Sequence, residues 1–258
     1  MNRISWKDKG SKMAVDLSKL YGRDFELSSG VELTFLQSET GDVGCVVWDA
    51  ALVLCAYLDH SHGKGLLKLC HKTVIELGAG TGAVGLVAAT LGADSFVTDL
   101  PELVPLMQQN LDKNRERIPG SCQALPLKWG DADQIKHLKE TVFNDGPDYI
   151  MLADCVYYDD SVKQLVDTIV CLSSSKTTVL CSYEERALGN KEALQSQFFK
   201  MISEHFLVSE VPLSEHHPEL RSSDIHIFRF TPLNDQGGWF GRERLDDEKT
   251  LVKKEHTK

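Results

Sequence analysis

The segment VIELGAGTGAVGL, residues 74–86, is the most informative part of the sequence, because a β-branched strand runs through a glycine-rich turn into a helical segment. Gly78, Gly80 and Gly82 stand at every second position, which predicts a tight turn whose backbone N–H groups meet a ligand at the start of a helix. Such a turn binds nucleotide-like ligands at the carboxyl end of a parallel strand. The pattern G-x-G-x-x-G/A also serves dinucleotides, so the turn alone leaves the ligand open.

Strand-like and helix-like segments alternate on both sides of this turn. The pattern predicts strands at 73–77, 95–98, 123–128, 148–153 and 177–183, and helices at 48–60, 83–91, 102–115, 132–141, 160–172 and 191–204. Such an alternation builds a parallel sheet with helices on both faces. The segments FLVSEVPL and DIHIFRF are close enough in sequence to pair antiparallel, and FELSSGVELTFL, residues 25–36, predicts a β-hairpin. We therefore expect an α/β, Rossmann-like fold with a seven-stranded mixed sheet and an N-terminal β-hairpin.

Length and composition indicate one catalytic domain. The 258 residues suffice for a single α/β domain, which we place at 23–231, between a loosely ordered N-terminus at 1–22 and a charged, disordered tail at 232–258. No apolar run approaches the ~20 residues that cross a bilayer, so we expect no membrane contact. Seven cysteines without a C-x-x-C pair indicate a reducing compartment, the cytoplasm or the nucleus.

The net charge of −10 argues against nucleic acid as a partner, since nucleic-acid binders concentrate Lys and Arg on one face. An acidic surface instead favours encounter with a basic protein. We expect no metal site, because the spacing of His60, His62, Cys70 and His71 fits no usual zinc site. Cys155 has no basic partner nearby in sequence and is expected to be a packing residue.

Two carboxylates near the glycine turn bear on the choice of ligand. Asp99 ends the strand in SFVTDL, 17 residues after Gly82, where an acid accepts hydrogen bonds from ribose hydroxyls. Glu76 stands two residues before the first glycine, where a carboxylate repels a pyrophosphate and attracts a cation. Glu76 therefore favours S-adenosylmethionine, which carries a sulfonium and an ammonium but no phosphate, over NAD. The alternative role for Glu76 is to cap a neighbouring helix.

A nicotinamide-dependent oxidoreductase remains the rival class of enzyme. It shares the glycine turn and Asp99, but it also needs a hydride-transfer site such as a Tyr with a Lys four residues later. Tyr157 is followed at that spacing by Ser161, and Tyr158 by Val162. The sequence therefore favours methyl transfer over hydride transfer.

Two further residues follow strands that end at the same edge of the sheet. Trp129, in LKWGD, comes after the third predicted strand of the sheet, where its indole suits stacking on an adenine ring, although ordinary core packing is the alternative. Asp154 comes just after the apolar strand YIMLA and is expected to face the reacting methyl across the cleft from Gly78. Its alternative role is to cap the next helix.

Taken together, these segments resemble the methyltransferase-like 21 family of seven-β-strand protein-lysine methyltransferases. The matching stretches, from about Arg23 to Phe230, are DVGCVVWDAA, ELGAGTGAVGLVAATLGAD, VTDL, LKWG, ADCVYY, YEERALG and RSSDIHI. The resemblance implies an enzyme that uses S-adenosyl-L-methionine, releases S-adenosyl-L-homocysteine, and trimethylates a lysine of the hexameric AAA ATPase called valosin-containing protein. Two alternatives stay open: a lysine of another protein, such as a chaperone or an elongation factor, and a catalytically silent cofactor-binding adaptor.

The resemblance also assigns roles to residues. The cofactor contacts that it implies are Trp48, Gly78, Ala79, Gly80, Asp99, Trp129 and Ala153. Asp154 to Tyr157 match the family's D-x-x-Y element, which borders the lysine and the methionine moiety of the cofactor. The segment reads Asp-Cys-Val-Tyr and not Asn-Pro-Pro-Tyr, which argues further against amines of nucleic-acid bases and glutamine as substrates.

The chemistry of methyl transfer suggests roles for the remaining polar and aromatic residues. A sulfonium methyl is already activated, so the site must chiefly hold a neutral amine in line with it. Asp154 acts as a base or as an orienting acceptor, and we favour orientation because an ordinary carboxylate is a poor proton acceptor. Aromatic rings attract cations, so Tyr157, Tyr158 and Trp48 are expected to line the lysine channel or cover the sulfonium. Three residues after the fifth strand are expected to contact the substrate backbone, with helix capping as the alternative: Tyr183, Glu184 and Arg186.

Overall fold

The computed structural model describes residues 15–186 and 191–233, which contain a seven-stranded mixed sheet in the order β5-β4-β3-β6-β7-β9-β8. The strands are β3 (Thr73–Leu77), β4 (Asp94–Asp99), β5 (Ser121–Pro126), β6 (Tyr149–Ala153), β7 (Thr178–Glu184), β8 (Phe206–Glu210) and β9 (Ile225–Pro232). Strands β3 to β7 are parallel to one another, whereas β9 pairs antiparallel with both β7 and β8. The expected mixed edge is therefore confirmed.

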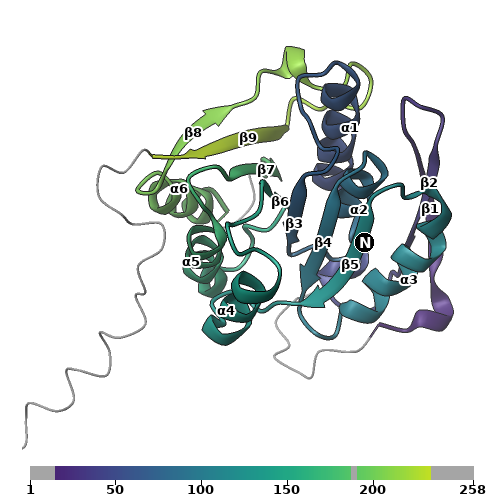
Figure 1. The fold of residues 1–258 in the computed structure, drawn as a ribbon, viewed down its shortest axis with the longest axis horizontal. Coiled ribbons are helices and arrows are strands. Elements are labelled where there is room, and N and C mark those ends of the chain that lie inside the picture. Colours follow the sequence, from purple (N-terminus) through teal and green to yellow (C-terminus); the bar gives the residue numbers. More distant parts are fainter. Residues whose placement is uncertain (1–14, 187–190, 234–258) are drawn as a thin grey trace, which may run out of the picture.

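Helices cover both faces of the sheet (Figure 1). They are α1 (Asp49–Gly63), α2 (Ala83–Thr90), α3 (Val104–Asn114), α4 (Ala132–Thr141), α5 (Val162–Leu172) and α6 (Lys191–Ile202). The first three pack in one apolar core and the last three in another. Successive strand residues alternate between the two cores, as Val74 and Ile75 show, because side chains point to opposite faces of a strand. The expected α/β fold is confirmed, and none of the described helices is long and apolar enough to span a membrane.

The order of the strands places a switch point between β3 and β6. The chain runs from β3 outward to β4 and β5, and then returns to build β6 and β7 on the other side of β3. Ligands of open α/β sheets bind outside the carboxyl ends of the strands at such a point. The glycine turn follows β3 and Asp154 follows β6, so both segments lie at this edge.

The N-terminal hairpin consists of β1 (Tyr21–Glu26) and β2 (Glu32–Gln37), and it is longer than the predicted 25–36. The 3₁₀ helix η1 (Leu17–Lys19) precedes it, and the loosely ordered N-terminus expected at 1–22 stays a prediction. Residues 1–14 and 234–258 lie outside the described residues, and with them nearly all of the predicted tail.

The hairpin is attached to α3 by two buried asparagines that replace a neighbouring strand. Asn110 accepts a hydrogen bond from the Leu36 N–H at 2.5 Å and donates to the Leu36 carbonyl at 2.9 Å. Asn114, one helical turn later, makes the same pair of bonds to Thr34, both at 2.9 Å. An amide side chain has the donor and the acceptor of a peptide group, so these two side chains satisfy the free edge of β2.

Candidate active site at the carboxyl ends of the strands

The glycine turn has a backbone that only glycine adopts easily. Gly78, Gly80 and Gly82 have φ angles of 63°, 55° and 82°. A Cβ atom added to Gly80 would lie 2.6 Å from the carbonyl oxygen of Gly44, and one added to Gly78 would lie 2.7 Å from the indole of Trp129. We call this turn, residues 78–82, the cradle; a side chain at Gly78 or Gly80 would force its neighbour, Trp129 or Gly44, to move. The N–H of Ala79 is fixed by the carbonyl of Thr98 at 3.0 Å.

Asp99 ends β4 beside this turn. One carboxylate oxygen accepts the N–H of Gly80 at 2.8 Å, and the other accepts the N–H of Leu100 at 2.7 Å. The side chain is nearly buried, so the two bonds hold its charge at the wall of the cradle. This is the place that the sequence analysis expected for an acceptor of ribose hydroxyls.

The structure gives Glu76 a different partner from the expected cationic ligand. Its side chain is 3% exposed, and its Oε2 accepts the N–H of Gly85, in the first turn of α2, at 2.7 Å. Burial raises its pKa to about 8, and the hydrogen bonds from the amides of Gly85 and Val84 oppose that rise. The capping role that was the alternative is therefore present, and a largely protonated carboxyl would not repel a pyrophosphate. The choice between the two ligands does not rest on Glu76.

Replacing Glu76 by Gln is expected to change how stability depends on pH. The folded carboxyl has a raised pKa, so the folded state holds a proton that the unfolded state releases between pH 4.5 and about 8, and stability falls as the pH rises through this window. From about pH 5.5 to about pH 8 this loss amounts to about 3 kcal/mol. Urea unfolding at both pH values measures the free energy of unfolding. This free energy should fall between the two pH values by about 3 kcal/mol more in the wild type than in Glu76→Gln. A difference between the two proteins that is the same at both pH values would contradict it.

Asn110 connects the hairpin to the glycine turn. Besides its bonds to β2, its side-chain amide donates to the carbonyl of Thr81 at 3.0 Å, whereas Asn114 has no bond to the turn. Sequence reasoning missed this residue, although two asparagines four residues apart on the face of α3 that carries Met107 and Leu111 were a usable signal. The second missed residue is Gly44, which packs directly on Gly80.

Asn110→Ala and Asn114→Ala are therefore expected to differ in one measurement. Each removes both bonds to β2 and should destabilise the fold by about 1–3 kcal/mol for the backbone groups left without partners. Only Asn110→Ala also removes the hydrogen bond to the carbonyl of Thr81 in the glycine turn. It should therefore weaken the binding of S-adenosylhomocysteine by about tenfold, or about 1.4 kcal/mol. Calorimetric titration of both variants tests this pair. Equal affinities would show that the bond to Thr81 does not shape the cradle.

One tryptophan borders the cradle, and a second lies beside Arg186. Trp129 is half-buried with its indole beside Gly78, where the sequence analysis expected a stacking surface for adenine. Trp48 is 40% exposed, and its Nε1 donates to the carbonyl of Val43 at 2.9 Å. The Cζ atom of Arg186 lies 5.1 Å from the centroid of the Trp48 ring. The implied contact of Trp48 with the cofactor stays a prediction.

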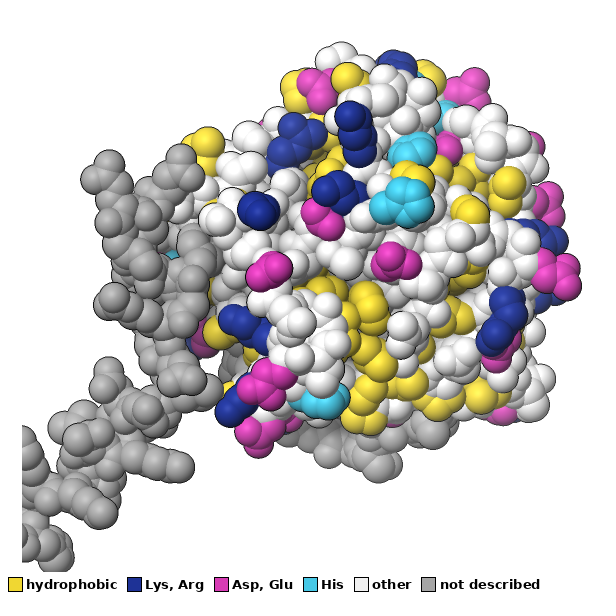
Figure 2. All heavy atoms as spheres, viewed as in Figure 1, with side chains coloured by type: hydrophobic (Ala, Val, Ile, Leu, Met, Phe, Trp, Pro, Cys, Tyr) yellow, Lys and Arg dark blue, Asp and Glu magenta, His cyan; other side chains and the backbone are white. Residues whose placement is uncertain are grey.

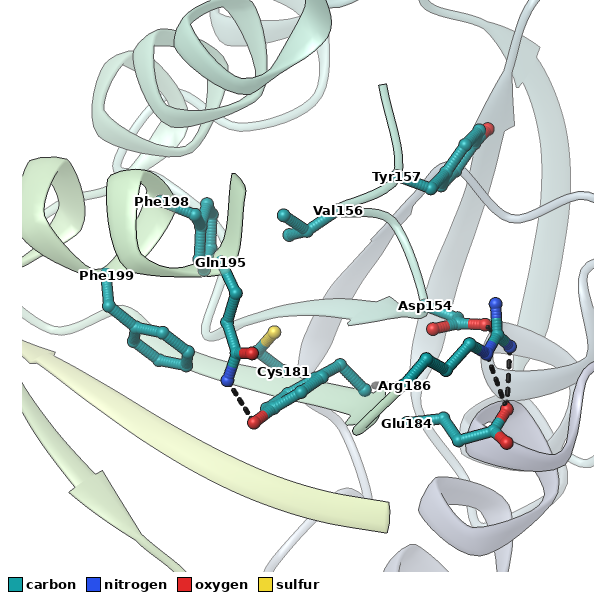
Figure 3. Close-up of a pocket in the computed structure, with 10 residues that line it drawn as sticks. Asp154, Val156, Tyr157, Cys181, Glu184, Arg186, Gln195, Phe198 and Phe199 are labelled. Atoms are coloured by element: carbon teal, nitrogen blue, oxygen red, sulfur yellow. Dashed lines mark hydrogen bonds and ion pairs between the residues drawn. The ribbon is translucent and has the colours of Figure 1, made fainter. Parts of the chain in front are cut away.

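Asp154 and Arg186 meet beyond the ends of β6 and β7. Asp154 has a φ of 54°, which is unusual for a residue other than glycine, and its N–H donates to the carbonyl of Ser182 at 2.8 Å. Its carboxylate forms an ion pair with Arg186, whose Nη2 also lies 2.7 Å from Oε2 of Glu184. Figure 3 shows the three side chains converging at one side of a pocket. Ala153 ends β6 opposite Ser182.

Burial raises the pKa of Asp154, and the positive charge of Arg186 opposes that rise. Arg186 therefore contacts both Asp154 and Glu184. Tyr183, the third residue expected to contact substrate backbone, has its ring stacked on His226 and Phe228, at centroid distances of 5.5 and 5.8 Å. Its hydroxyl accepts a hydrogen bond from Gln195. Any contact of these residues with a substrate stays a prediction.

The two tyrosines after Asp154 differ in exposure. Tyr158 is 55% exposed, while Tyr157 is half-buried, and their ring centroids are 4.5 Å apart. Burial raises the pKa of Tyr157 well above its usual range, with smaller contributions from Cys155 and Asp99. Tyr157 lines the same pocket as Asp154, and Figure 3 shows its ring extending away from Arg186.

Cys155 is a packing residue, as expected. Its thiol is buried 3.3 Å from the carbonyl of Leu77, and burial raises its pKa well above the ordinary value, so it is a poor nucleophile. Residues 15–186 and 191–233 contain no group of three or more possible metal ligands. The rings of His60 and His217 contact each other at a centroid distance of 5.5 Å.

The fold and this site define a class I methyltransferase that uses S-adenosylmethionine. The cradle fits this cofactor, because Asp99 offers an anchored acceptor for ribose hydroxyls and the indole of Trp129 lies beside Gly78. A solved structure of the 16S rRNA methyltransferase from T. thermophilus, in complex with AdoMet and guanosine, has the same fold with a TM-score of 0.54. It is 17% identical to this chain, and the match covers 83% of this chain and 51% of that one.

The model of the lysine methyltransferase family matches residues 27–205, and the chain belongs to this family. It is 36% identical over 191 residues to protein N-lysine methyltransferase METTL21A of Xenopus tropicalis, a match that covers 72% of this chain and 77% of the relative. It is 32% identical over 206 residues to EEF1A lysine methyltransferase 3 of Xenopus tropicalis, with 78% and 82% of the two chains covered. The enzyme class expected from the sequence, a protein-lysine N-methyltransferase, is confirmed.

Proposed function

We propose that this chain transfers methyl groups from S-adenosylmethionine to one lysine of valosin-containing protein, up to the trimethyl state. One observation carries the choice of a cationic amine as the acceptor. At the edge of the cradle a mostly buried carboxylate, Asp154, is presented by an unusual backbone conformation and holds a cationic side chain beside an aromatic ring. A site that holds a cation between a carboxylate and an aromatic ring suits the ammonium group of a lysine.

The proposal assigns the cofactor to the residues of the cradle. Glu76 holds the start of α2, which follows the turn, by accepting the N–H of Gly85. The residues proposed to hold the cofactor are Trp48, Gly78, Ala79, Gly80, Asp99, Trp129 and Ala153. S-adenosylmethionine supplies a methyl group that is already activated by its sulfonium. Asp99 would accept the ribose hydroxyls, and Trp129 would cover the adenine ring.

The proposed task of the chain's own residues is to present lysine as a neutral amine. Lysine has a pKa near 10.4, so only about one side chain in a thousand is neutral at physiological pH. Asp154 would orient the nitrogen by accepting its hydrogen bond, and a proton leaves to solvent or to this carboxylate, whose pKa is raised by burial. Trp48, Tyr157 and Tyr158 would surround the amine with aromatic faces, which tolerate each added methyl better than hydrogen-bond acceptors do.

The proposed target rests on the resemblance of seven stretches between Arg23 and Phe230 to the methyltransferase-like 21 family. Two observations agree with a protein as the partner. The chain carries a net charge of −10, and Figure 2 shows acidic and basic side chains interspersed over one face with no continuous basic patch. The names of the relatives include an elongation-factor enzyme, so an elongation factor, a chaperone and an adaptor role without turnover remain outcomes of the test.

The seven cysteines support an intracellular site of action in the cytoplasm or the nucleus. All seven lie in the described part of the chain and none forms a disulfide. A reducing compartment keeps thiols in this state. We therefore propose this location, which fractionation of cells expressing a tagged chain would test. Recovery of the full-length chain from the secretory pathway would contradict it.

The test of the function is incubation of the purified chain with labelled S-adenosylmethionine and, separately, purified valosin-containing protein and a cell extract. We expect label on one lysine of valosin-containing protein, with mono-, di- and trimethyl forms identified by mass spectrometry. If label appears only on a lysine of another protein, the proposed target is wrong, whereas the proposed lysine methylation stands. Binding of S-adenosylhomocysteine without label on any protein would support the adaptor role.

A further inference from the structure

Arg186 is enclosed by three groups that belong to the site. Its guanidinium pairs with Asp154, and its Nε and Nη2 lie 3.0 and 2.7 Å from Oε2 of Glu184. Its Cζ lies 5.1 Å from the ring centroid of Trp48. The side chain of Arg186 is only 24% exposed. We call Asp154, Glu184 and Trp48 the cation nest.

The composition of the nest is that of a receptor for an organic cation. Carboxylates bind ammonium and guanidinium groups through charge-assisted hydrogen bonds, and an aromatic face attracts the same cations. The nest also adjoins the cradle: Cys155, the residue after Asp154, has its sulfur 2.9 Å from the position of a Cβ on Gly78. The segment that carries Asp154 therefore packs against the glycine turn through its next residue.

We propose that Arg186 is an internal occupant of the lysine subsite, and that the ammonium group of the substrate lysine displaces it from the cation nest. This inference rests on the proposed function, because it adds to the lysine subsite of that reaction a side chain that fills it before the substrate binds. It gives Arg186 a different role from the one expected in the sequence analysis, which was a contact with the substrate backbone.

Arginine is suited to the role of an internal occupant because it fills the subsite without accepting a methyl group. The guanidinium stays protonated in proteins and has no free lone pair to attack a methyl group. A lysine at the same position would lose a proton to solvent and become a nucleophile. Its Nζ lone pair would form the new N–C bond, while the C–S bond of the sulfonium breaks and its electron pair remains on sulfur as a thioether.

The first experiment uses this difference. Purified Arg186→Lys is incubated with S-adenosylmethionine, without any other protein, and examined by intact mass and peptide mass spectrometry. We expect methylation at position 186. The matched control is Arg229→Lys, because Arg229 is also half-buried but donates to the hydroxyl of Tyr57, at 2.9 Å, and not to the nest. Position 229 should remain unmodified.

The second experiment needs no cofactor and no turnover. The probe is n-butylammonium, titrated against the wild type and Arg186→Gln while the signal of the Trp48 indole N–H is followed by NMR. We expect saturable binding to Arg186→Gln and at least about tenfold weaker binding to the wild type, equivalent to about 1.4 kcal/mol of competition by Arg186. Adding Asp154→Asn to Arg186→Gln should abolish the binding. Retained binding of S-adenosylhomocysteine checks that each variant is folded, and Arg186→Lys keeps the test available if Arg186→Gln does not fold.

The outcomes separate the inference from the proposed function. An unmodified position 186 in a chain that methylates protein lysines would overturn the inference and leave the function standing. Equal binding of n-butylammonium to the wild type and Arg186→Gln, or binding to neither, would also overturn it. If the wild type methylates no protein, the proposed function fails, and automethylation at position 186 would still establish the subsite.

Discussion

Asp154→Asn is expected to lower kcat for protein methylation by about 100-fold, because displacing a reacting group by about 1 Å from its line of attack can cost this much. Asparagine tolerates a positive φ, so the backbone at 54° should keep its conformation while the charge is lost. The binding of S-adenosylhomocysteine should be nearly unchanged. The measurement is single-turnover kinetics on the labelled protein substrate, together with a calorimetric titration of the cofactor product.

A matched control is Asp159→Asn, which removes an exposed carboxylate five positions further along the same segment. It should leave both measurements unchanged. If Asp154→Asn retains full turnover, Asp154 neither orients nor deprotonates the amine. If kcat falls but is restored at high pH, Asp154 is chiefly a proton acceptor, and the preference for an orienting role is wrong.

Asp99→Ala is expected to weaken the binding of S-adenosylhomocysteine by about 100-fold, which corresponds to about 2.7 kcal/mol. The substitution removes the proposed acceptor of the ribose hydroxyls and also frees the N–H groups of Gly80 and Leu100. A single hydrogen bond to a charged group is worth about 1.5–3 kcal/mol, so the loss of one ribose bond accounts for the effect. Calorimetric titration measures it, with turnover as a second readout.

The control for this prediction lies on the same strand. Asp94→Ala, at the opposite end of β4, removes an exposed carboxylate that accepts a hydrogen bond from Ser121 at 2.7 Å. It should leave the affinity unchanged. Undiminished affinity of Asp99→Ala would remove the ribose assignment and leave Asp99 with only its structural bonds to the turn.

The sequence was sufficient for the fold because local patterns and pairing agree along most of the chain. The predicted bounds of β3 match the structure, since a strand with four apolar or β-branched residues among its five runs directly into a glycine with φ of 63°. The antiparallel pair β8 and β9 was predicted from the short distance between two apolar segments. The hairpin was placed by its turn, but the bonds of β2 to the two asparagines of α3, 80 and 74 positions away in sequence, are tertiary contacts that the local pattern does not contain.

The sequence predicted which segments carry the residues of the site, but only some of the contacts between those residues. Glu76 was placed at the end of β3 as expected, yet Ile75 and Leu77 point into the core under α4 to α6, so Glu76 must point to the opposite face, beneath α2. The meeting of Asp154 with Arg186 depends on the pairing of β6 with β7, which sets Ala153 opposite Ser182. Such a register is a property of the sheet, and neither segment shows it alone.

The decisive measurement is a crystal structure of the chain with S-adenosylhomocysteine bound. We predict ribose hydroxyls within hydrogen-bonding distance of Asp99, adenine against Trp129, and the sulfur directed toward Asp154. A product molecule bound with its ribose away from Asp99, or with its sulfur directed away from Asp154, would contradict the assignment of the cradle and of the lysine site beside it.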